Sequence, residues 1–128
     1  AILRFRIYWE DDDSVYRDIA IRHSQSFFDL HSCILKSFEF DSKHKATFYR
    51  SNDNWLRGRD ISLEKYDKDY KAEPLIMADT IIGSEISNPN QKFIYEYDRI
   101  AHPGYVEKNS ITWKFCSNVI KVLDNLQQ

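Results

Sequence analysis

Hydrophobic and polar residues alternate one by one over the first part of the chain. Apolar residues take every second position from 3 to 9, and a similar run covers 15–22 after the acidic segment 10–14. Alternation of this kind is typical of a strand with one buried face. Because the link is short, we expect the two runs to pair as an antiparallel hairpin. Arg17 falls on the apolar face, and we expect it to reach past the core or to pair with a carboxylate.

A different period follows the hairpin. Between residues 26 and 38, apolar side chains and His31 recur three or four positions apart, which is the spacing of one buried helix face. Ser26 and Asp29 have the spacing of a capping box, which also places negative charge at the positive end of the helix dipole. The pattern therefore predicts a helix over 26–38 that packs on the sheet.

The middle of the chain contains shorter signals. Residues 44–50 alternate and predict a third strand, and residues 93–98 predict another that is rich in β-favouring aromatics. Residues 55–63 fit either a strand or an irregular return. Residues 64–73 are dense in charge without a period, which is typical of an exposed loop. We expect Asp79 to cap a short helical turn over 80–86.

The C-terminal part has two conflicting patterns. Ile111, Trp113 and Phe115 alternate as a strand would, whereas the apolar residues between Cys116 and Leu126 fit a helix. We predict a strand-like entry followed by a terminal helix.

Taken together, these elements predict one α+β domain over residues 1–128. We expect a mainly antiparallel sheet, curved or partly closed into a barrel, with the helix of residues 26–38 covering one face.

The composition excludes several functional classes but does not identify the function. The chain has 18 basic and 20 acidic residues, so it is not basic as a whole, although a local basic face is compatible with this balance. Cys33 and Cys116 lack CxxC spacing or a His/Cys cluster, so we expect no metal, no cofactor and a reducing, cytoplasmic compartment. No apolar run approaches the roughly 20 residues that span a bilayer, and we expect neither a signal peptide nor a membrane partner.

One candidate polar site combines His31, His44, Glu96 and Asp98. Imidazole and carboxylate groups suit zinc or iron, and paired carboxylates can act as acid and base. This set gives the alternative function, a small metal-binding or hydrolytic enzyme. We favour a structural interpretation, because no second ligand lies four positions after His31. His31 would then be a core histidine bonded to a carbonyl or a carboxylate, and the two acids would line the solvent side of a strand.

A second candidate is the outer face of the hairpin. Its binding residues are Arg4, Arg6, Tyr8, Tyr16 and Arg22. Basic side chains interleaved with tyrosines can contact phosphates and stack on bases. A continuation, on the condition that the third strand neighbours the hairpin, would add Lys43, Lys45, Arg50, Arg57 and Arg59. Two other interpretations remain open: an ordinary polar face balanced by acids, and a protein-binding face or strand edge.

Several segments also carry a family resemblance: VYRDIAI and FFDLHSCI, DSKHKATF, and MADTIIGSEISNPNQKFIYEYD. Its most specific parts are Leu30-His31, His44 with Phe48, and Phe93-x-Tyr95-Glu96-Tyr97-Asp98. Over about positions 3–98 the chain resembles the plasmid ORF-three-like family of bacterial proteins, named after an Ri-plasmid gene product and sometimes labelled as a transposon resolvase passenger. The resemblance implies an α+β fold, no established biochemical role, and a companion role beside DNA-binding segments. The chain departs from the family pattern after Asp98, where the usual aromatic residue and nearby Trp are missing.

The sequence therefore favours a non-catalytic binding or accessory module with an unknown partner. Nucleic-acid association linked to mobile elements is the narrower version of this prediction. The small enzyme remains the alternative.

Overall fold

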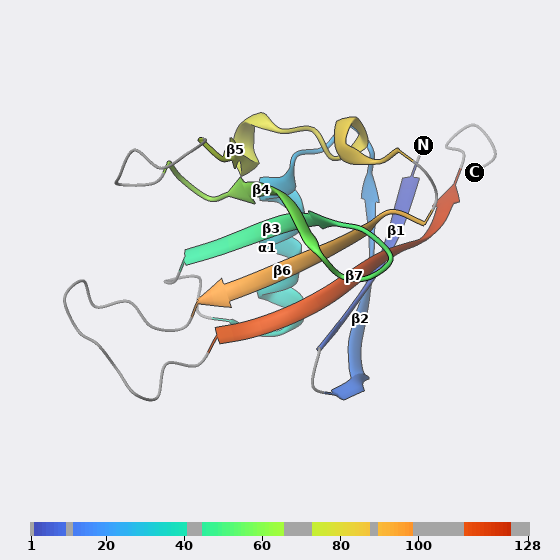
Figure 1. The fold of residues 1–128 in the computed structure, drawn as a ribbon. Coiled ribbons are helices and arrows are strands. Elements are labelled where there is room, and N and C mark those ends of the chain that lie inside the picture. Colours follow the sequence, from blue (N-terminus) through green and yellow to red (C-terminus); the bar gives the residue numbers. More distant parts are fainter. Residues whose placement is uncertain are drawn as a thin grey trace.

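One seven-stranded sheet with a helix on one face makes up the architecture (Figure 1). The computed structural model describes residues 2–9, 12–40, 45–65, 73–87, 90–98 and 112–123, of which 13, 98 and 112–123 are described by their backbone only. The elements are β1 (Ile2–Trp9), β2 (Asp12–Arg22), α1 (Phe27–Ser37), β3 (Lys45–Ser51), β4 (Arg57–Ser62), β5 (Leu75–Ile76), the 3-10 helices η1 (Met77–Asp79) and η2 (Ile82–Glu85), β6 (Lys92–Asp98) and β7 (Thr112–Leu123).

The strand order is β2-β1-β7-β6-β3-β4-β5. All neighbouring strands are antiparallel except β4 and β5, which are parallel. The predicted α+β class with a mainly antiparallel sheet is therefore confirmed. The sheet is open, with β2 and β5 as its two edges, so it does not close into a barrel. None of the described helices is long and apolar enough to cross a membrane.

The β1–β2 hairpin forms as the alternation predicts. Leu3, Phe5 and Ile7 are buried on the α1 side, and the residues between them point to the opposite side, which we call the open face. Arg17 pairs with Ile7 in the register and therefore starts on the α1 side. Its Nε donates a hydrogen bond to the carbonyl oxygen of Ser37 at 3.0 Å. The cation thus lies at the negative end of the helix dipole, where it is favourable.

Helix α1 begins at the predicted cap. The Ser26 side chain accepts a hydrogen bond from the Asp29 backbone, and the Asp29 carboxylate accepts one from Ser26 in return. The buried helix residues are Phe27, Leu30, His31 and Ile34. Phe27 lies between two strands, with ring centroids 5.3 Å from Phe48 and 5.5 Å from Phe93. The core therefore forms where α1 crosses the sheet, behind β3 and β6 in Figure 1.

The segment after β5 agrees with the prediction in part. The helical turn predicted over 80–86 forms as the 3-10 helix η2, but η1 precedes it and the side chain of Asp79 caps neither of them. The Thr80 hydroxyl instead donates to the carbonyl of Ile76, and the Thr80 carbonyl accepts from the amide of Phe27. The segment is held by the start of α1, which makes a local cap unnecessary. Ile82 of η2 is fully buried.

Two other predictions concern less regular segments. The alternative between a strand and an irregular return at 55–63 is decided by β4, which is preceded by Trp55 with a positive φ of 59°. The predicted exposed loop over 64–73 lies largely outside the described residues.

The predicted terminal helix is wrong. Residues 112–123 form β7, which pairs along one edge with β1 and along the other with β6. The strand-like entry was correct, and the strand continues through the part that fitted a helical period. The pairing with β1 shifts register between Arg4 and Phe5, which leaves one extra residue in β7 and breaks its two-residue alternation.

Candidate binding surface

His31 is part of the core. It is 4% exposed, and its Nδ1 lies 2.8 Å from the hydroxyl oxygen of Tyr95 in a hydrogen bond. Burial lowers the pKa of His31 to about 4, so the ring is neutral at pH 7. Burial also raises the pKa of the Tyr95 hydroxyl, which therefore stays protonated. The partner is a tyrosine rather than the carbonyl or carboxylate expected from the sequence.

The other members of the candidate polar site do not join His31. Glu96 follows Tyr95 on β6, so it points to the open face, where it forms an ion pair with Arg57. Asp98 occupies the same face of β6 by register, and His44 lies outside the described residues. His31 and Glu96 are thus separated by the sheet. Within the part of the chain that the structure describes, no group of three His, Cys, Asp or Glu residues could hold a metal.

The five predicted binding residues of the hairpin all lie on the open face by their strand register. Arg6 makes a two-point contact with Asp18, with Nε–Oδ1 at 2.9 Å and Nη2–Oδ2 at 3.1 Å. Its guanidinium also lies 4.5 Å from the ring centroid of Tyr16. The hydrogen bonds from Arg6 lower the pKa of the Asp18 carboxyl, which keeps it ionised at neutral pH.

Arg4 and Arg22 are the other basic residues on the open face of the hairpin, and the charge of Arg4 also helps to lower the pKa of the Asp18 carboxyl. Both are exposed, and neither forms an ion pair with another described residue. Tyr16 lies further along the hairpin, opposite Tyr8, and is 43% exposed. The hairpin therefore combines accessible positive charge with an accessible aromatic ring.

The connection between β3 and β4 adds a further aromatic residue to this face. Figure 1 shows the connection passing in front of the sheet, whereas α1 lies behind it. The Asn52 side chain accepts hydrogen bonds from the backbone amides of Asn54 and Leu56 and so fixes the loop. Trp55 then meets the ring of Tyr8 edge to face at a centroid distance of 6.3 Å. Through this contact the loop reaches the hairpin, although β7 and β6 separate β3 from β1.

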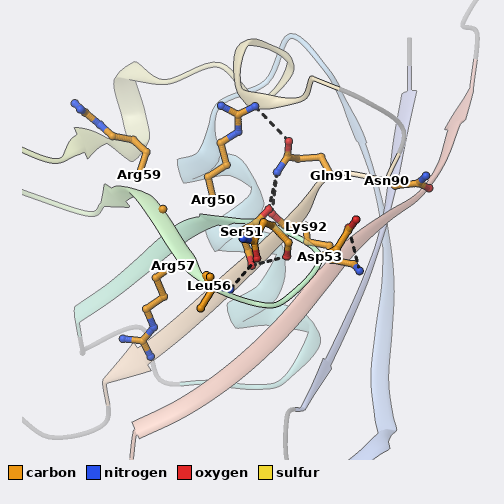
Figure 2. Close-up of a pocket in the computed structure, with 11 residues that line it drawn as sticks. Arg50, Ser51, Asp53, Leu56, Arg57, Arg59, Asn90, Gln91 and Lys92 are labelled. Atoms are coloured by element: carbon orange, nitrogen blue, oxygen red, sulfur yellow. Dashed lines mark hydrogen bonds and ion pairs between the residues drawn. The ribbon is translucent and has the colours of Figure 1, made fainter.

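Lys92, the first residue of β6, links the loop to a groove. Its Nζ lies 5.2 Å from the Trp55 ring centroid and 3.3 Å from the Asp53 carboxylate. The groove has a volume of about 730 Å³ and lies where β3 ends and β6 begins (Figure 2). It is lined by Arg50, Ser51, Asn52, Asp53, Leu56, Arg57, Gly58, Arg59, Asn90, Gln91 and Lys92.

Gln91 organises one wall of the groove. It is 6% exposed, and its Nε2 donates to the carbonyl of Ser51 at 3.1 Å. Arg50 donates from Nη2 to the hydroxyl of Ser87 at 2.9 Å and to Oε1 of Gln91 at 3.3 Å. At Gly58 a Cβ would lie 2.8 Å from the carbonyl oxygen of Arg50, so a larger residue would force the backbone strands apart. The wall is therefore fixed by buried polar contacts and by a close backbone approach.

The charge of the groove differs from that of the chain. Its lining contains four basic residues and one acid, whereas the whole chain carries a net charge of −2. Arg57 is balanced by Glu96 and lies 4.9 Å from the Tyr49 ring centroid. Arg50 bonds only neutral groups, and Arg59 donates to the backbone carbonyl of Glu73 at 3.3 Å. Of the four cations, Arg50 and Arg59 therefore have no described carboxylate that neutralises their charge.

Sequence patterns identified part of this surface. Arg50, Arg57 and Arg59 were expected to extend the hairpin face, but they gather around the groove instead of continuing a neighbouring strand. Lys45 is exposed at the start of β3, and Lys43 lies outside the described residues. Trp55 and Lys92 were missed, since nothing in the local sequence shows that the loop folds back across the sheet.

These elements define an α+β protein in which, among the described residues, a helix covers one sheet face and none covers the other. The chain belongs to the plasmid pRiA4b ORF-3-like protein family, whose model matches residues 2–101. This confirms the family inferred from the tyrosine-rich strand and the helix. No match to the chain was found among curated proteins or among solved structures. The family description names no biochemical activity.

Proposed function

We propose that the chain is a non-catalytic binding module that contacts an acidic partner through its open face and the adjoining groove. The observation that carries this proposal is the set of basic groups on the open face of the hairpin and around the groove of a protein whose net charge is −2. Arg4 and Arg22 lie on the hairpin, and Arg50 and Arg59 lie at the groove, none of them in an ion pair with another described residue. Such a local field attracts negative charge even when the net charge is negative.

The aromatic residues of the open face support a contact role. Tyr8 and Trp55 form a half-buried pair, and Tyr16 is more exposed. Large, stiff rings contribute contact area at low entropic cost, and aromatic residues and Arg are enriched at binding surfaces. No comparable support exists for the enzyme alternative, because His31 and Glu96 face opposite sides of the sheet.

Retention on immobilised heparin in a salt gradient tests the proposal. Reversing both unpaired hairpin charges, Arg4→Glu with Arg22→Glu, removes positive charge without breaking an ion pair. We expect this variant to elute at clearly lower salt than the wild-type chain. The control is Lys36→Glu, which makes one such charge reversal at an exposed position of α1, at the other side of the sheet. Equal shifts for both variants, or no retention of the wild-type chain, would contradict the proposal.

Three narrower predictions accompany this function. The plasmid origin of the family name favours an association with mobile elements. Cys33 is a free thiol, which favours a reducing, cytoplasmic compartment. The core cluster extends from β1 to β6, which supports a single domain.

A further inference from the structure

We propose that the open face binds single-stranded nucleic acid, with the groove holding phosphates and the neighbouring aromatic rings stacking on bases. This inference rests on the proposed binding function and names the chemistry of its partner. It depends on three features of the surface: the direction of the groove cations, the way they are held, and the rings that lie beside them.

The cations of the groove surround it instead of meeting at one point. Figure 2 shows Arg57, Arg59 and Lys92 pointing away from one another. A site for one small anion requires donors that converge on it. Diverging cations around an open groove fit a chain of regularly spaced negative charges, as in a phosphate backbone.

The two uncompensated groove cations are fixed in place. Arg50 is held by Ser87 and by the buried Gln91, and Arg59 by the carbonyl of Glu73. A guanidinium has five N–H donors, so each of these groups retains donors for phosphate oxygens. Because the partners in these contacts are neutral, a bound phosphate does not have to displace a carboxylate. The groove is therefore prepared for phosphate contacts before any ligand arrives.

The rings distinguish nucleic acid from other polyanions. Lys92 lies over Trp55, Trp55 contacts Tyr8, and the more exposed Tyr16 lies on the neighbouring strand. Stacking of one base on an exposed ring strengthens binding about tenfold and tolerates any base sequence. A sulfated polysaccharide has no flat aromatic groups and gains nothing from these rings. In a duplex the bases are already stacked, so single strands fit better.

Fluorescence anisotropy with labelled oligothymidylate and oligouridylate tests the inference, and the two probes separate DNA from RNA as the source of the strand. Tyr16→Leu removes the stacking ring, and we expect about tenfold weaker binding to one or both strands. Tyr16→Phe keeps the ring and should bind like the wild-type chain. Heparin retention of both variants should be unchanged, since heparin has no bases.

A second variant tests the groove. Arg59→Gln removes a cation whose hydrogen bond within the described residues goes to a backbone carbonyl, and we expect the dependence of log affinity on log salt to become shallower by about 0.7. Lys36→Gln on α1 makes the same charge change away from the surface and should leave the slope unchanged. A slope that is the same for Arg59→Gln and the wild-type chain would overturn the role of the groove.

The outcomes separate this inference from the proposed function. Heparin retention without oligonucleotide binding, tighter binding to a duplex, or equal affinities for Tyr16→Leu and Tyr16→Phe would overturn the nucleic-acid assignment and leave an acidic partner in place. Absence of both heparin and oligonucleotide binding would overturn both.

Discussion

The two faces of the sheet use aromatic and polar residues in different ways, one in a buried core and the other beside charged groups. On the α1 side, Phe27, Phe48 and Tyr95 pack with almost no exposure. His31, the only buried histidine among the described residues, is neutral there. On the open face, aromatic rings lie beside guanidinium groups, as Tyr16 does beside Arg6. In these examples the aromatic rings are buried on the α1 side and contact charged groups on the open face.

β6 is where the two environments meet. Tyr95 turns its hydroxyl toward His31, and the next residue, Glu96, turns to the open face and pairs with Arg57. Polar groups are therefore satisfied by a neutral hydrogen bond on one side and by an ion pair on the other. Substitutions on the α1 side should mainly change stability, and those on the open face should mainly change binding.

The largest expected effect is on the α1 side. Phe27→Ala removes the ring between β3 and β6 and should lower the free energy of unfolding by about 3–5 kcal/mol. The neighbouring Phe28 is 44% exposed, so Phe28→Ala is a matched control with a much smaller expected loss. Urea titration of both variants measures the difference. Equal losses would show that the α1 side is not the packed core.

A smaller effect is expected from the pH dependence of stability. The folded-state pKa of His31 is about 4, below the ordinary value of 6.5, so the unfolded chain binds a proton first as the pH falls. Stability from this group is complete above about pH 6.5 and is lost toward pH 4, by about 2 kcal/mol between pH 7 and pH 5. His31→Gln should lack this part of the pH dependence in urea titrations at the two pH values. The exposed His23, changed to Gln, serves as the control, and an unaltered pH dependence in His31→Gln would contradict the assignment.

The smallest effect on stability is expected on the open face. Asp18→Asn removes the exposed partner of Arg6, and exposed ion pairs contribute little to folding. The same change frees positive charge, so the variant should elute from heparin at higher salt than the wild-type chain. Unfolding curves and heparin elution together check the two statements. A large loss of stability with unchanged elution would reverse the distinction between the faces.

Local signals explain which elements could be predicted. The hairpin and α1 follow from alternation and from the Ser26–Asp29 capping box, both of which act within a few residues. β7 could not be assigned, because its identity depends on pairing with β1 and β6, and tertiary pairing overrides a weak helical period.

The candidate surface was predictable in part for the same reason. The outward position of Arg6 and Tyr16 follows from strand alternation alone. The contact between Trp55 and Tyr8 joins residues far apart in sequence, across a loop whose path depends on Asn52 and on a positive φ at Trp55. The groove likewise requires the backbone of β4 to approach Arg50 at Gly58, which no single segment reveals.

The position of β7 between β1 and β6 also affects when the sheet can be completed during folding. Among the described strands it alone connects the β1–β2 hairpin to β6, and its residues, 112–123, lie beyond the 2–101 span of the family match. During synthesis, the edges of β1 and β6 that pair with β7 therefore stay unpaired until this segment leaves the ribosome. A chain shortened to the family boundary would keep those edges exposed, which invites aggregation.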